Sequence, residues 1–118
     1  MPGELNARTL SDVATAVWRL QNKITEGPAL RHVRAVVDAL TAAGVETRQY
    51  DRIAFDSGMR LRVLAFEPTP GLTGERIVET VRPSVHLHGT LIQLGEVIVG
   101  IPETSPEEKG GDDGRDDD

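Results

Sequence analysis

Apolar residues recur with alternating spacings of three and four over the first third of the chain. Between residues 10 and 24 the spacings are 3, 4, 3 and 4, and between residues 30 and 40 they are 3, 4 and 3. This spacing places the apolar side chains on one stripe of an α-helix, as in the a and d positions of a heptad. The first stripe holds Leu10, Val13, Val17, Leu20 and Ile24, and the second holds Leu30, Val33, Val37 and Leu40.

Capping and breaking residues divide this region into two helices. The first helix can begin at Thr9 or Ser11, whose hydroxyls accept hydrogen bonds from free backbone N–H groups. The sequence Glu26-Gly27-Pro28 interrupts the stripe, because glycine loosens the backbone and proline is tolerated in a first helical turn. Gly44 follows the second stripe in the place of a helix-terminating glycine. We therefore expect an antiparallel helical hairpin over residues 9–44.

The predicted hairpin is too small to be stable alone. About ten buried apolar side chains contribute about 15–30 kcal/mol, whereas ordering about 35 residues costs at least ~1 kcal/mol each in backbone entropy. Helical hydrogen bonds offset only part of this cost. Two arrangements would supply the missing contacts. Two hairpins can pair as a four-helix bundle in a homodimer, with the two stripes as the dimerisation surface, or the hairpin can dock on the rest of its own chain.

Alternating apolar and polar positions follow the second helix and predict strands. Residues 59–66 alternate in this way, and residues 76–82 form a second run that ends before Pro83. The segment between them, 67–75, is rich in proline and glycine and predicts a loop. Together with the short runs that follow, these segments predict a small antiparallel β-domain over residues 45–102 and an α+β fold for the chain.

Two histidines stand one residue apart in the stretch 84–100, SVHLHGTLIQLGEVIVG. Alternate side chains of a strand share a face, so His86 and His88 could hold a metal ion. A metal site needs further ligands, and the third histidine, His32, lies on the second helix. The alternative is a two-residue hairpin turn at His88-Gly89, where both residues adopt positive φ, with His86 as a partly exposed strand residue. We favour the turn and predict no metal site.

The formal net charge of −6 lies entirely at the end of the chain. From Glu103 onward there are eight acidic and two basic residues, which leaves 11 of each sign in the body. This tail, 103–118, lacks apolar residues that could be buried and is predicted to be disordered, like residues 1–8. A neutral body lacks the basic surface typical of proteins that bind nucleic acid or anionic membranes. We interpret Arg60 and Arg62 as a solvated or salt-bridged strand face.

The sequence contains no catalytic constellation. It has no nucleophile elbow, no phosphate-cradling glycine loop and no obvious acid–base pair of carboxylates. The absence of cysteine excludes disulfides and cysteine zinc sites. The N-terminus lacks the apolar core of a signal peptide, and no apolar run approaches the ~20 residues of a membrane span. We expect a cytoplasmic, non-catalytic binding protein without a metal, cofactor or small-molecule substrate.

Three segments, taken in order, resemble the GrpE family, the nucleotide exchange factors of DnaK-type chaperones. They are VVDALTAAGVE at 36–46, Phe55-Asp56 after a short linker, and IVETVRPSVHLHGTLIQLGEVIVG at 77–100. The resemblance implies a helical hairpin in a dimeric four-helix bundle and a β-domain that wedges into the chaperone's nucleotide-binding domain. It also implies a co-chaperone that promotes ADP release during protein folding and the stress response.

The resemblance also implies a set of partner contacts on the β-domain. These contacts, which pack and orient the partner without chemistry, would come from Phe55, Asp56, Val81, Thr90 and Val99.

The chain departs from the family pattern at several positions. Ser57 stands at a proline position, Ser84-Val85 replaces Gly-Tyr, Thr90 stands at a partner-contacting arginine position, and Leu94-Gly95 replaces Pro-Ala. The long N-terminal coiled coil is also missing from this sequence. The resemblance therefore implies a divergent short member with its own DnaK-like partner. A dimeric adaptor that keeps the fold and has lost exchange activity is the second hypothesis.

Overall fold

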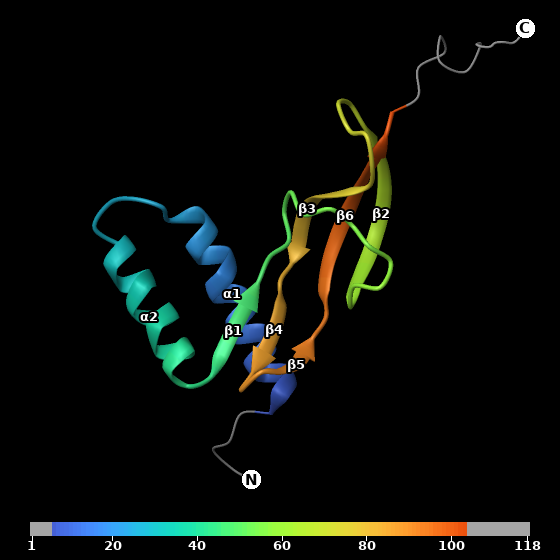
Figure 1. The fold of residues 1–118 in the computed structure, drawn as a ribbon. Coiled ribbons are helices and arrows are strands. Elements are labelled where there is room, and N and C mark those ends of the chain that lie inside the picture. The colour runs from blue at the N-terminus through green and yellow to red at the C-terminus, as the bar shows by residue number, and fades with distance from the viewer. Residues whose placement is uncertain (1–5, 104–118) are drawn as a thin grey trace, which may run out of the picture.

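The computed structural model describes residues 6–103 and has an α+β fold, with two helices followed by six strands (Figure 1). Disorder was predicted for residues 1–8 and 103–118, of which 1–5 and 104–118 lie outside the described residues. For Ala7 and Arg8 the prediction is wrong, because both belong to the first helix. The elements are α1 (Ala7–Lys23), α2 (Leu30–Ala42), β1 (Val45–Arg48), β2 (Leu61–Thr69), β3 (Arg76–Arg82), β4 (Ser84–Leu87), β5 (Thr90–Gln93) and β6 (Gly95–Pro102).

Helix α1 begins two residues earlier than predicted. Its N-cap is Asn6, whose Oδ1 accepts a hydrogen bond from the backbone N–H of Thr9 at 2.8 Å. An asparagine oxygen satisfies a free N–H of the first turn in this way, so the capping predicted for Thr9 or Ser11 is wrong. Both residues lie inside the helix, and Ser11 is buried.

Helix α2 ends as the sequence predicts. Gly44 follows the C-cap residue Ala43 with a φ of 87°, and its N–H donates to the carbonyl of Thr41 at 2.9 Å. A left-handed glycine in this place satisfies carbonyl groups at the helix end, so the predicted termination is confirmed. The two helices pack against each other. Within residues 6–103, no helix is long and apolar enough to cross a membrane.

The strands form two separate three-stranded sheets. The first has the order β1-β4-β5 and is antiparallel throughout, whereas the second has the order β2-β6-β3 with β2 and β6 parallel. The prediction of a wholly antiparallel β-domain is therefore wrong, because β2 and β6 are parallel. After β3, the chain passes through β4 and β5 of the first sheet before it returns as β6, and such a long crossover permits parallel pairing.

The strand boundaries differ from the predictions at β1 and at both ends of β2, which begins at Leu61 and not at Met59. The pairing of Val45–Arg48 as β1 was missed, although Val45 and Thr47 alternate with polar residues. Strand β2 runs on through Pro68, which was expected in a loop. Because β2 is an edge strand, a residue without an N–H donor is tolerated there. The bounds predicted for β3 are confirmed.

Each sheet has its own small core and its own cover. Helix α1 crosses the first sheet, as Figure 1 shows, and the linker 49–60 covers the second. The first core consists of Ala14, Val45 and Val85, packed by Leu10, Leu40, Leu87 and Ile92. The second consists of Ile77, Val97 and Val99, packed by Tyr50, Phe55, Met59, Leu61 and Val63.

Helix α1 docks on the sheet with a face that differs from its apolar stripe. The buried residues of α1 are Ser11, Ala14, Thr15 and Trp18. This face is rotated from the stripe by about a third of a turn around the helix axis. Docking on the same chain, one of the two arrangements considered, is therefore present. Val13 and Leu20 of the stripe remain 41% and 47% exposed, and their predicted role in dimerisation stays a prediction.

Candidate partner-binding surfaces

The two neighbouring histidines do not form part of a metal cluster. Among residues 6–103, no group of three or more His, Cys, Asp or Glu side chains is placed to hold a metal ion. His32 is exposed on α2, and His88 lies in the turn between β4 and β5. The φ angles of His88 and Gly89 are 48° and 83°, as a two-residue turn with two left-handed positions requires. The predicted turn is confirmed.

His88 joins this turn to the end of α2. Its backbone N–H donates to the carbonyl oxygen of Gly44 at 2.7 Å. Its ring lies over the same glycine, because a Cβ built on Gly44 would collide with His88 Nδ1. The contact fixes the junction of α2 and β1 against the β4–β5 turn, so His88 has a structural role.

His86 occupies a different environment from His88. It is paired with Glu46 of β1 and Leu91 of β5, and it alternates with core residues, so it lies on the sheet face away from the helices. The residue is half-buried, as predicted, but its Nδ1 is buried without a hydrogen-bond partner. Burial lowers the pKa of His86 from its usual value of 6.5; Arg48 lowers it further, Glu46 opposes this, and Arg60 adds to the lowering.

A cleft of about 180 Å³ lies between the two sheets beside His86. It is lined by Tyr50, Met59, Arg60, Leu61, His86, Gly89 and Leu91. The start of β2 thus meets the β4–β5 hairpin here. The prediction that Arg60 and Arg62 share a strand face is wrong, because β2 begins at Leu61. Arg62 instead pairs with Glu96 at 4.0 Å, while Arg60 lines the cleft.

Phe55 and Asp56 lie on the linker that covers the second sheet. The Phe55 ring meets the ring of Phe66 edge-on, with 6.2 Å between centroids and 79° between planes. Phe55 is half-buried, whereas Phe66 is 53% exposed on the edge strand β2. Asp56 is exposed, and its Oδ1 accepts a hydrogen bond from Gly58 N–H at 2.9 Å. The exposed aromatic at this place is therefore Phe66, which the sequence-based prediction missed.

The other three predicted contact residues are dispersed. Val81 is half-buried near the end of β3, and Thr90 is exposed at the start of β5 in the other sheet. Val99 is 0% exposed and belongs to the second core together with Phe55. In this conformation Val99 offers no side-chain surface to a partner, because it is packed between β2 and β3, so its role is corrected to that of a core residue.

Eight large apolar side chains are exposed in the described part of the chain, and five of them form two groups; the other three are Ile53, Val78 and Leu94. We call the first the helical surface, formed by Val13, Leu20 and Val36. We call the second the β2 surface, formed by Leu64 and Phe66. Leu64 lies at the irregularity in the pairing of β2 with β6, between Val63 and Ala65. Contiguous apolar patches, unlike single exposed apolar side chains, are typical of sites that bind another protein, and these two surfaces are where we expect such a site.

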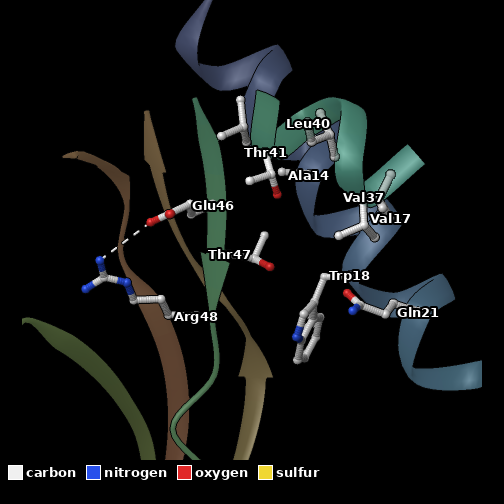
Figure 2. A pocket seen from close by; sticks show the side chains of 11 residues that line it. Ala14, Val17, Trp18, Gln21, Val37, Leu40, Thr41, Glu46, Thr47 and Arg48 are labelled. Atoms are coloured by element: carbon white, nitrogen blue, oxygen red, sulfur yellow. Dashed lines mark ion pairs between the residues drawn. The ribbon is translucent and has the colours of Figure 1, made fainter. Parts of the chain in front are cut away.

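A groove runs between the two helices. One part, a cleft of about 290 Å³, has Val17, Trp18, Val37 and Leu40 on its helical walls (Figure 2). Its β1 side carries the ion pair of Glu46 and Arg48, with 3.7 Å between Oε1 and Nη2. A second part, of about 460 Å³, shares Gln21 and Val37 with the first. The predicted dimerisation residues lining the two parts are Val17, Ile24, Leu30, Val33, Val37 and Leu40.

The chain was compared with protein-family models and with curated proteins, and it matches none of them.

Proposed function

We propose that this protein is a GrpE-like co-chaperone. It binds the nucleotide-binding domain of a DnaK-type chaperone and promotes ADP release, and it acts as a homodimer joined through its helices. The observation that carries this proposal is the exposure of apolar side chains on both the helical surface and the β2 surface, which lie in different parts of the fold. One surface serves self-association and the other serves the partner.

The order of the segments supports the same assignment. The run 36–46 covers the end of α2, the terminating Gly44 and the start of β1, and the run 77–100 covers β3 to β6. Both runs carried the resemblance to the GrpE family. The helical pair followed by a β-region is the element order that this family implies.

A dimer through the helices would need the groove as well as the helical surface. Val13, Leu20 and Val36 are each about half exposed, so covering them in both copies of a symmetric dimer contributes about 5 kcal/mol. Association costs about 4–15 kcal/mol in lost translational and rotational freedom. The contacts of the helical surface alone therefore offset the cost of association only at the lower end of its range. Side chains of the second copy must also fill the groove beside Val17 and Val37.

Exchange by such a protein is a shift of populations in its partner. The β2 surface would bind the open form of the chaperone's nucleotide cleft better than the closed, ADP-bound form. The coupling is reciprocal, so ADP would weaken the complex by the same factor. No group of this protein takes part in a covalent step. The direct test is the release of labelled ADP from DnaK-type chaperones of the same organism, which this protein should accelerate.

A dimeric adaptor without exchange activity is the second candidate. The burial of Val99 favours it, because a predicted contact residue lies inside the core. Thr90 favours it as well, because this exposed residue carries no charge where the family places an arginine. The adaptor predicts binding of a DnaK-type partner without faster ADP release. A pull-down that recovers no such partner would count against both candidates.

A further inference from the structure

The cleft between the two sheets has a polar side and an apolar side. Arg60, His86 and Tyr50 form the polar side, and Met59, Leu61 and Leu91 line the remainder. The Tyr50 hydroxyl is already hydrogen-bonded to the Ser84 hydroxyl at 2.8 Å. Arg60 and His86 are therefore the polar groups of the cleft that are left to meet a ligand.

Three arginines in the described part of the chain are ion-paired, whereas Arg60 is exposed and, like six others, has no carboxylate partner within that part; it differs from those six by lining this cleft. Each of those three lies within 4.0 Å of a carboxylate, in the pairs Arg48–Glu46, Arg62–Glu96 and Arg82–Asp12. Arg60 forms no such pair with any residue between 6 and 103. Its guanidinium is a planar donor that matches the geometry of a carboxylate, so it is equipped to hold one.

His86 adds a second unsatisfied group. The Nδ1 of His86 is buried without a hydrogen-bond partner, which is costly, and a bound ligand is one reason for a protein to retain such an atom. The charged groups around the ring are Arg48 and Glu46 on β1 and Arg60 beside the cleft. Arg48 and Arg60 disfavour protonation of the imidazole, whereas an anion bound beside the ring would favour it.

We propose that this cleft binds a carboxylate group, as carried by an aspartate or glutamate side chain of a peptide, between Arg60 and His86. The volume of about 180 Å³ suits one side chain and excludes a large ligand. The apolar part of the same peptide packs against Met59, Leu61 and Leu91. The site needs only these residues and does not rest on the proposed exchange activity.

A titration of the full chain with acetylated aspartyl-leucine amide, followed by NMR of the histidine side chains, tests this site. The signals of His86 should shift and saturate, whereas those of His32, exposed on α2, should stay in place. Arg60→Gln should weaken binding roughly threefold to tenfold, because it removes a partly solvated charge-assisted contact. Arg60→Lys should keep part of the affinity. The matched control is Arg62→Gln, which removes an arginine that pairs with Glu96 outside the cleft and should leave the affinity unchanged.

The pH dependence of peptide binding is a second test of the site. Binding of the carboxylate should raise the pKa of His86, so the affinity should increase as the pH is lowered from 8 to 6. Four results would overturn the proposal. The first is that the His86 signals do not shift at millimolar peptide, and the second is that Arg60→Gln and Arg62→Gln lose equal affinity for the peptide. The third is that the uncharged asparaginyl-leucine amide binds as tightly as the aspartyl peptide. The fourth is that inorganic phosphate binds in place of the peptide. Thermal unfolding of each variant shows that it is folded.

Discussion

The imidazole of His88 lies against the α-carbon of Gly44, and the two residues also share a backbone hydrogen bond of 2.7 Å. Glycine is required at position 44 for two independent reasons. Its φ of 87° is unfavourable for any residue with a Cβ, and the position that a Cβ would take is filled by the ring of His88. A residue that looked like a metal ligand thus holds a helix end against a hairpin turn.

Gly44→Ala should lower the free energy of unfolding by at least about 2 kcal/mol, because the strained φ and the clash add. The control is Gly27→Ala, at a φ of 90° with no atom within 4 Å of the new Cβ, which should cost only about 1 kcal/mol. Urea unfolding measures both. His88→Gly, which removes the ring, should reduce the cost of Gly44→Ala in a double-mutant cycle. Equal costs for the two glycines would show that the ring contact is absent in solution.

Trp18 and Leu20 report which face of α1 is buried within the chain. Trp18 is 8% exposed and donates its Nε1–H to Gln49 Oε1 at 2.9 Å, so Trp18→Ala should cost about 3–5 kcal/mol. Leu20→Ala should cost less than about 1 kcal/mol. Both values come from thermal or urea unfolding at the lowest practical protein concentration, where association contributes least. The reverse order of costs would mean that the stripe is the docking face of the helix.

The dimer is tested by placing a charge on the helical surface. Leu20→Glu should shift the mass in light scattering at micromolar concentration from that of a dimer to that of a monomer, because a carboxylate cannot be buried there without a partner. The matched control is Arg19→Glu, which changes the charge at a neighbouring exposed position outside the stripe. A monomer mass for the unaltered chain, or an equal effect of both substitutions, would contradict the dimer.

Acid should destabilise the protein through His86. Because its pKa is lower in the folded than in the unfolded state, the unfolded chain takes up the proton first as the pH falls below about 6.5. The contribution of His86 to the free energy of unfolding is therefore complete above this pH, and it is lost as the pH falls towards the folded-state pKa. Urea unfolding at pH 7.5 and pH 5.5 should show a smaller loss of stability in His86→Gln than in the unaltered chain. Identical losses would mean that His86 titrates normally.

Local patterns in the sequence were sufficient to predict most of the local elements, but not β1 or the start of α1. The helical stripes, the terminating Gly44, the bounds of β3 and the turn at His88-Gly89 each depend on residues close together in the chain. Features that depend on distant residues were missed. The docking face of α1 was overlooked because it is centred on small residues around Ala14, which carry no strong apolar signal.

The same limit applies to the candidate sites. The parallel pairing of β2 with β6 depends on a crossover through another sheet. The unpartnered Nδ1 of His86 and the nearby Arg60 come from segments about 25 residues apart, so no motif in the sequence joins them. Val99 was assigned to a partner contact by resemblance, and its position in the alternating pattern of β6 was the available sign that it is buried.

The release of fluorescent ADP in a stopped-flow instrument tests the central claim most directly. Each DnaK-type chaperone of the same organism is mixed with excess unlabelled nucleotide, with and without the full chain. Exchange activity predicts that at least one of them loses ADP affinity by roughly 5- to 150-fold, seen mainly as faster dissociation. Phe66→Ala should reduce this acceleration, and Val78→Ala, at an exposed position on the opposite edge strand β3, should not. Unchanged ADP release from every one of these chaperones would contradict the account.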